Sequence, residues 1–285
     1  MKTATLLRRE IRRGWRLLRL VLHLLTGAAS VYCAFALLER LPRDRARRAK
    51  QRLARWWSRR LCYIMNVEIR LDGRPAPQPT LFVSNHVSWL DIPCLLAAVD
   101  AAFVSKHDVL DWPVIGEMAA RTETIFLKRG GRKAASMTAE QMTWRLASRR
   151  SVIFFPEGTT TNGASVRLFH ARLYQAAIRT HSPVQAMGIR YRGKNGPCGV
   201  VPFINDDTLL PHLWTLLGED YLIAQIKLCD PVLANTDRRT LADRNRAQVC
   251  EVLGLEAPKT KRRRYPYRPA AVEDFTTVEN LRAEA

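Results

Sequence analysis

The chain has 285 residues, of which 47% are hydrophobic and 25% are charged, and its formal net charge is +20. These proportions are those of a folded globular protein, and they exclude a chain that is disordered over most of its length. A charge of +20 is large for this length and predicts an acidic partner: a nucleic acid, an anionic membrane surface, or acidic substrates and carriers. The positions of the basic residues distinguish these classes.

The N-terminal part of the chain holds a long apolar stretch between two basic flanks. Residues 20–38 read LVLHLLTGAASVYCAFALL, long enough to cross the core of a bilayer as a helix. Arginines such as Arg12 and Arg16 precede it and others such as Arg43 follow it, whereas a simple crossing carries its basic residues on one side. We therefore expect a segment that dips into one leaflet, or a helical hairpin with residues 42–65, holding both basic flanks on anionic head groups. A single span is the alternative.

From residue 66 onward, short β-rich runs alternate with helical patterns. The predicted strands are 67–71, 80–84, 102–105, 124–127, 151–155, 184–191 and 221–228. The predicted helices are 89–98, 132–148, 168–180, 208–217 and 238–254. This alternation predicts an α/β sheet covered by helices on both faces. We thus expect three parts: a membrane-associating helical segment (1–65), a globular domain (66–258) and a basic tail (259–285).

A histidine and an aspartate follow the second predicted strand, in the stretch FVSNHVSWLDIP. His86 and Asp91 fall where the strand ends, at the edge where open α/β sheets bind ligands. On a continuous helix a five-residue step would rotate the two side chains apart by about 140°, so they can meet only if the chain turns between them. Ser88 is the expected N-cap of a helix after that turn. Asp91 would then orient His86 and leave its other ring nitrogen free to take a proton. A polar surface loop is the alternative.

Two other predicted strands also end in polar residues. The run SVIFFPEGTTTNG continues after its apolar part with Glu157, Gly158 and three threonines, and TIFLKRGGR ends in Lys128 and Arg129. Glycine allows a close backbone approach to a ligand, and arginine suits a phosphate. Alone, the first stretch could be a polar turn and the second a solvated charge run. Together with the histidine and aspartate above, they predict one active site formed by three neighbouring strand ends at one edge of the sheet.

These stretches resemble the motifs of the lysophospholipid acyltransferase family, typified by 1-acyl-sn-glycerol-3-phosphate acyltransferase. NHVSWLD matches the H-x-x-x-x-D box, IFLKR resembles the Arg block, FPEGT matches the F-P-E-G-T box, and PVQA resembles the Pro-containing strand. The likeness covers roughly residues 65–230. The fourth block has Ala186 where a second proline is common, and RLFH stands where the family has a Leu-Pro-Phe-Lys-like run. Both departures bear on the substrate rather than on the reaction.

The resemblance implies a mixed sheet covered by helices and an O-acyltransferase. The enzyme would move a fatty acyl group from acyl-CoA or acyl carrier protein to the free hydroxyl of 1-acyl-sn-glycerol-3-phosphate, giving phosphatidate, with no metal, cofactor or covalent intermediate. A lyso-ornithine lipid or another lyso-lipid is the alternative acceptor. The implied roles are a general base and its orienting partner (His86, Asp91), a phosphate site (Arg129, Lys128) and a wall of the acceptor site (Glu157, Gly158, Thr159).

The resemblance also implies a place on the cytoplasmic face of the inner membrane, where residues 1–65 would bind anionic lipids. A nucleic-acid-binding protein is a remote alternative, because the basic clusters mostly flank the apolar stretch and no nucleic-acid motif appears in the sequence. A non-catalytic membrane protein is the third class. It differs from the enzyme in predicting that His86→Ala leaves every phenotype intact.

Overall fold

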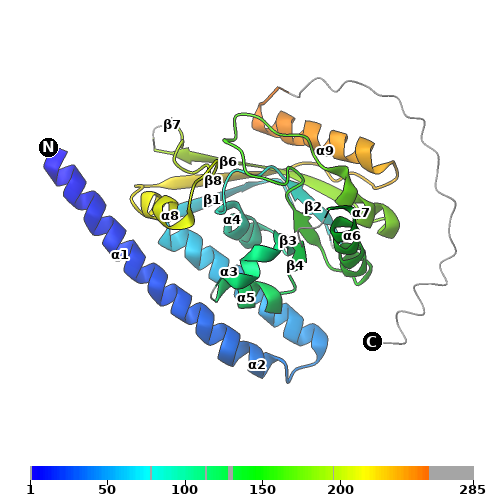
Figure 1. Cartoon of the computed structure of the whole chain (residues 1–285), viewed down its shortest axis with the longest axis horizontal. Helices are drawn as coiled ribbons and strands as arrows, with labels where there is room; N and C mark the ends of the chain where they lie inside the picture. Colours follow the sequence, from blue (N-terminus) through cyan, green and yellow to red (C-terminus); the bar gives the residue numbers. More distant parts are fainter. Residues whose placement is uncertain (1, 78, 113, 128–130, 195, 257–285) are drawn as a thin grey trace.

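The N-terminal segment forms a helical hairpin. The computed structural model describes residues 2–77, 79–112, 114–127, 131–194 and 196–256 (Figure 1). The first arm consists of α1 (Lys2–Ala29), the π-helical segment η1 (Ser30–Ala34) and α2 (Phe35–Leu38), and α3 (Arg43–Ile64) folds back beside it. The His23 ring stacks on Trp57 at 4.5 Å between centroids, and His23 Nε2 lies 3.0 Å from the Trp57 carbonyl oxygen. The helical hairpin with residues 42–65, one of the two arrangements expected for the apolar stretch, is therefore present.

The first arm is apolar but is fastened to the rest of the protein. Its helical stretch Leu6–Leu38 is long and apolar enough to cross a membrane, judged by length and composition. Near its start, Arg12 Nη2 donates to the Gly218 carbonyl at 2.6 Å and Arg16 Nη1 donates to the Leu217 carbonyl at 3.1 Å. These carbonyls lie at the end of α8 (Leu209–Leu217), where a helix dipole attracts cations. Arg12 and Arg16, expected on lipid head groups, thus contact the protein itself.

A mixed eight-stranded sheet forms the centre of the described part of the domain. Its strands are β1 (Val67–Asp72), β2 (Leu81–Ser84), β3 (Ala102–Lys106), β4 (Ile125–Leu127), β5 (Val152–Phe154), β6 (Val184–Gly193), β7 (Gly196–Pro197) and β8 (Leu222–Leu228). They are ordered β1-β8-β6-β2-β5-β3-β4, with β7 paired to β6. The strands from β6 to β4 are parallel, whereas β8 runs antiparallel to β6 and parallel to β1. The predicted mixed α/β fold is confirmed.

Helices cover both faces of this sheet, with α3 and α9 on opposite sides in Figure 1. The remaining elements are α4 (Asp91–Ala98), η2 (His107–Asp111), α5 (Ile115–Arg121), α6 (Gly131–Ala147), η3 (Ala171–Tyr174), α7 (Gln175–Thr180) and α9 (Arg238–Leu253). Residues of α3 and α4 pack in one apolar core, and residues of α6, α7 and α9 pack in a second core on the other face. Each strand in the middle of the sheet is therefore buried on both sides.

The seven predicted strands all form, whereas three short elements were not predicted. These are β7, the 3₁₀ turn η2 and the helix α5. The helix expected over 168–180 is divided into η3 and α7. The tail expected at 259–285 lies outside the described residues.

Candidate active site

His86 and Asp91 meet because the chain turns directly after β2. The Asn85 side chain continues the pairing with β6: its amide donates to the Ile189 carbonyl at 2.9 Å and accepts from the Ile189 N–H at 2.8 Å. The chain then turns, and α4 begins at Asp91. His86 Nδ1 lies 2.7 Å from Asp91 Oδ2. A spacing that would separate the two side chains on a helix thus brings them into contact.

Asp91 has 0% exposure and accepts four hydrogen bonds. Besides His86 Nδ1, its Oδ2 accepts from the N–H groups of Val87 at 2.7 Å and Ser88 at 3.0 Å, and its Oδ1 accepts from the Tyr191 hydroxyl at 2.7 Å. A carboxylate in such a setting is an acceptor only, so Nδ1 of His86 carries its hydrogen. The lone pair of Nε2 is consequently left to accept a proton.

Ser88 does not cap the following helix as predicted. The cap position of α4 is Leu90, which makes no side-chain cap hydrogen bond. The carboxylate of Asp91 instead reaches back to the backbone N–H groups of the turn. The physical reason is that the helix begins later than predicted, at Asp91, so the long hydrogen bond from the Leu90 N–H to the Ser88 hydroxyl (3.4 Å) lies in the turn before it.

Phe155 fixes the plane of the His86 ring. The two rings are stacked, with centroids 3.8 Å apart and planes 4° from parallel. Phe155 follows β5, which pairs with β2 in parallel, so both residues leave the sheet at the same edge. The His86 side chain keeps 17% exposure. The ring is therefore held from one face and from Nδ1 while it remains in part accessible.

Glu157 binds backbone groups. It has 3% exposure; its Oε1 accepts from the His86 N–H at 2.8 Å and its Oε2 accepts from the Arg167 N–H at 2.7 Å. Burial raises the pKa of Glu157, and the two backbone hydrogen bonds oppose that rise. Gly158 next to it has φ +71°, and Thr159 is exposed. The predicted acceptor-site residue Glu157 thus fixes the position of His86 and of the loop that ends at Arg167.

The end of β4 lies on the same edge of the sheet as the ends of β2 and β5, but not beside them. In the sheet β2 is adjacent to β5, whereas β3 separates β5 from β4. The expectation that all three are neighbours was wrong, because β3 enters the sheet between them. Lys128 and Arg129, which follow β4, lie outside the described residues. Within the described chain, no group of three or more His, Cys, Asp and Glu side chains is placed to hold a metal ion.

Sequence reasoning missed the contribution of β6 to this site. Tyr191 lies 100 positions from Asp91, and Asn85 is paired with Ile189, 104 positions away. The apolar run of β6 predicts a buried strand but does not indicate which strand lies beside it. The parallel pairing of β2 with β6 brings these residues together.

Comparisons with known proteins agree with this architecture. A protein-family model described as Acyltransferase matches residues 66–190. A lyso-ornithine lipid O-acyltransferase of Pseudomonas aeruginosa is 40% identical over 257 residues, which are 90% of this chain and 98% of the relative. The chain belongs to the lysophospholipid acyltransferase family. It is therefore an acyltransferase.

One further relative and one solved structure also match this chain. A 1-acyl-sn-glycerol-3-phosphate acyltransferase of Neisseria meningitidis is 31% identical to this acyltransferase over 190 residues, covering 65% of this chain and 74% of the relative. The crystal structure of the 1-acyl-sn-glycerophosphate acyltransferase PlsC of Thermotoga maritima matches with a TM-score of 0.65 at 18% identity, over 92% of this chain and 100% of that chain. The fold is thus shared with a solved acyltransferase.

Proposed function

We propose that this acyltransferase moves a fatty acyl group from a thioester donor to the free hydroxyl of a lyso-ornithine lipid, with His86 as the general base. The observation that carries the mechanism is the contact between His86 Nδ1 and the buried carboxylate of Asp91 at 2.7 Å, with Phe155 stacked on the ring. This arrangement leaves Nε2 as the proton acceptor. A base held in one orientation is what an alcohol needs to become a nucleophile.

The reaction then proceeds without an enzyme-bound acyl group. Nε2 of His86 takes the proton of the lyso-lipid hydroxyl while the oxygen attacks the thioester carbonyl carbon. The C–S bond breaks, and the departing thiolate receives the proton from the imidazolium, so the ring returns to its starting state. Asp91 stabilises the imidazolium in between. A thioester is already activated, so a base and correct positioning are sufficient, and we propose acyl-CoA or acyl carrier protein as donor with no cofactor.

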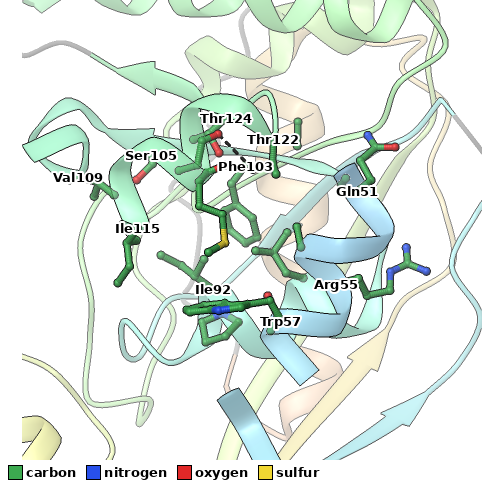
Figure 2. Close-up of a pocket in the computed structure, with 18 of the residues that line it drawn as sticks. Gln51, Arg55, Trp57, Ile92, Phe103, Ser105, Val109, Ile115, Thr122 and Thr124 are labelled. Carbon is green, nitrogen blue, oxygen red and sulfur yellow. Dashed lines mark hydrogen bonds between the residues drawn. The ribbon is translucent and has the colours of Figure 1, made fainter. Parts of the chain in front are cut away.

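A cavity of about 190 Å³ next to the site is suited to the acyl chain. It lies between α3, α4, β3 and α5, and its lining is mainly apolar, with Trp57, Ile92 and Phe103 gathered around it in Figure 2. Phe103 packs on Phe155 at 5.6 Å between ring centroids, and Phe155 in turn stacks on His86. An acyl chain in this cavity would therefore be separated from His86 by the rings of Phe103 and Phe155.

Two observations support a lyso-ornithine lipid as the acceptor. The relative of that name from Pseudomonas aeruginosa matches over 98% of its own length. The two stretches that surround His86, residues 85–91 and 155–163, contain hydroxyls and amides but no lysine or arginine. A phosphate-bearing acceptor would be expected to meet cations near the reacting hydroxyl.

The second candidate acceptor is 1-acyl-sn-glycerol-3-phosphate. It is supported by the Neisseria relative, which carries that acceptor in its name, and by Lys128 and Arg129 after β4. For this candidate, Arg129 would bind the phosphate while Glu157, Gly158 and Thr159 shape the wall of the acceptor site.

The acceptor can be identified with purified full-length protein. Lyso-ornithine lipid and 1-acyl-sn-glycerol-3-phosphate are each offered with acyl-CoA and with acyl-loaded carrier protein, and His86→Ala is the blank. We expect the higher kcat/KM with lyso-ornithine lipid and a rate lower by about 10²–10⁴-fold in the blank. A preference for the glycerophosphate transfers the assignment to the second candidate, and wild-type-like turnover by His86→Ala overturns the mechanism.

We further propose that the first arm lies within one leaflet on the cytoplasmic face of the inner membrane, next to anionic lipids. Large apolar side chains along the outer side of this arm are exposed: Leu6, Leu7, Ile11, Trp15, Leu18, Leu22, Leu25, Tyr32 and Leu37. The same arm is fastened to α8 by Arg12 and Arg16 and to α3 by His23. A helix that crossed the bilayer would have to give up these contacts, so the structure favours the in-plane arrangement.

Flotation with vesicles tests this placement. The triple variant Ile11→Ser, Trp15→Ser, Leu22→Ser should lose vesicle binding, whereas the control Leu233→Ser, an exposed leucine elsewhere, should bind like the wild type. Tags at the two chain ends should be digested from the same side of sealed membranes. Tags on opposite sides would establish a single span instead.

A further inference from the structure

Tyr191 reaches the site from the middle of the sheet. It lies in β6, which pairs with β2, and its side chain is 6% exposed. Its hydroxyl donates to Asp91 Oδ1 at 2.7 Å. The two residues are 100 positions apart, so only the pairing of β6 with β2 brings them together.

The two carboxylate oxygens of Asp91 accept hydrogen bonds from different donors. Oδ2 takes the side-chain hydrogen of His86 and the two backbone N–H groups of the turn. Among the hydrogen bonds of the described residues, the Tyr191 hydroxyl alone reaches Oδ1. Rotation of the carboxylate about its Cβ–Cγ bond would move both oxygens. The three bonds to Oδ2 hold one end of the group, and the bond from Tyr191 holds the other end, so it helps to fix the direction of the contact to His86.

The hydroxyl of Tyr191 remains a donor in this environment. Burial and, after it, the charge of Asp91 raise the pKa of Tyr191 well above its usual value. The other titratable groups around Asp91 are His86 and Glu157 on the loops, Cys94 on α4 and Cys62 on α3. The hydrogen bond between Cys62 and Cys94, and then burial, raise the pKa of the Cys94 thiol, so this thiol adds no second negative charge. Tyr191 is therefore neutral. It donates a hydrogen bond to the Asp91 carboxylate and carries no negative charge that would repel it.

We propose that Tyr191 is a positioning residue of the acyl transfer: its hydroxyl holds Asp91 in the orientation that sets the His86 ring for proton removal. The inference rests on the proposed role of His86 as the base. It adds a residue outside the four motif blocks to the functional set. The competing interpretation is that Tyr191 only fills space in the apolar core.

The test compares two buried tyrosines. Tyr191→Phe removes the hydroxyl and keeps the ring, and Tyr174→Phe is the matched control, because Tyr174 is fully buried and its hydroxyl has no partner among the described residues. We expect kcat of Tyr191→Phe to fall about 10- to 100-fold, the range for losing a hydrogen bond to a charged group, with KM for the acceptor little changed. Tyr174→Phe should keep the wild-type kcat.

The pH profile separates positioning from packing. Without the donor the negative charge of the His86–Asp91 pair is less stabilised, so the pair holds its proton more tightly. The acidic limb of kcat/KM should therefore move to higher pH in Tyr191→Phe, since His86 must be unprotonated to act as a base. A loss of thermal stability with an unchanged limb and unchanged kcat would establish the packing role and overturn the proposal.

A second variant covers the case in which Tyr191→Phe does not fold. Site-specific replacement of Tyr191 by difluorotyrosine keeps the shape and makes the hydroxyl a stronger donor, so the acidic limb should move to lower pH. An unchanged limb in this variant also overturns the proposal. Turnover by His86→Ala in the same assay would instead refute the proposed role of His86 as the base, whereas an inactive His86→Ala with a wild-type-like Tyr191→Phe would refute only the role of Tyr191.

Discussion

Two buried carboxylates flank His86, and they hold different parts of it. Asp91 binds the ring through Nδ1 and accepts four hydrogen bonds, one of them from the Tyr191 side chain on β6. Glu157 binds the backbone N–H of His86 and that of Arg167. The first carboxylate contacts the ring that we propose as the general base, whereas the second contacts only backbone N–H groups.

From this difference in contacts we expect two different roles, one in the reaction and one in the structure of the loops. A negative charge that contacts the imidazole stabilises it when it becomes protonated, so its loss should affect the reaction itself. A carboxylate that receives two backbone N–H groups acts through the shape of the loops, so its loss should affect folding and placement. Variants of both carboxylates, and of their neighbours, should reveal this division.

The largest effect should come from His86→Ala, which removes the group that both carboxylates hold. We expect acyl transfer to fall by about 10²–10⁴-fold, the usual contribution of a general base. Vesicle flotation should remain close to the wild type. Thermal unfolding should show a modest loss, because the ring is mostly buried and stacks on Phe155. Substantial turnover in this variant would show that His86 is not the base, and the contacts of the two carboxylates to it would then not explain their roles.

The next effect should come from Asp91→Asn, which keeps the shape and removes the charge. We expect kcat to fall by about 10²-fold, because a neutral amide neither fixes the Nδ1–H form of the ring nor stabilises the imidazolium. Unfolding in urea should show a loss of about 1–3 kcal/mol, since the buried amide leaves some of the four donors without an acceptor. A variant with wild-type kcat would show that the ring needs no charged partner.

Glu157→Gln should have a smaller effect on activity. One amide oxygen can replace only one of the two carboxylate acceptors, so the His86 backbone or the Arg167 backbone loses its partner. We expect kcat to fall roughly tenfold through misplacement of the base. A loss as large as that of Asp91→Asn would place Glu157 in the chemistry itself.

The same variant should alter the pH dependence of stability. Burial raises the pKa of Glu157 above its ordinary value of 4.5. The folded protein therefore binds this proton more tightly than the unfolded chain, a contribution that is full below pH 4.5 and is lost as the pH rises through the raised pKa. The unfolding free energy of the wild type relative to Glu157→Gln should decrease over that window. An increase would mean that the two backbone hydrogen bonds outweigh burial.

Gly158→Ala should have the smallest effect. Gly158 has φ +71°, which costs a non-glycine residue about 1–2 kcal/mol, so urea unfolding should show a loss of that order. An added Cβ would meet the His170 ring at 3.4 Å, an ordinary contact, and kcat should remain within about twofold of the wild type. A stable variant with much lower kcat would show that the acceptor needs this space.

The sheet could be predicted because each strand carries its own local signal. Runs such as those of β2, β5 and β6 are apolar, β-rich and bounded by polar residues, so their position along the chain follows from the sequence. Which strands lie next to each other in the sheet does not follow from the sequence. The insertion of β3 between β5 and β4 depends on tertiary packing, and it separated strand ends that were expected side by side. Helix α5 was missed because it is short and begins after Val114, a β-branched residue with φ +64°.

The active site was predictable to the extent that its residues are close in sequence. His86 and Asp91 were identified as a pair, and the turn between them was required by their spacing. The direction of the Glu157 carboxylate could not be inferred, because its partner N–H groups belong to residues 71 and 10 positions away. Tyr191 gave no local signal at all, since a tyrosine at the end of an apolar strand is most often a core residue.

The fastening of Arg12 and Arg16 to the end of α8 has a consequence for how the enzyme finds its substrate. If the first arm lies in a leaflet, a catalytic domain joined to it by a flexible linker could swing freely above the surface. Here the bonds from the two guanidinium groups leave no such hinge. The height of His86 above the lipid surface is then set by the fold, and the encounter with a lyso-lipid becomes a search in two dimensions rather than three.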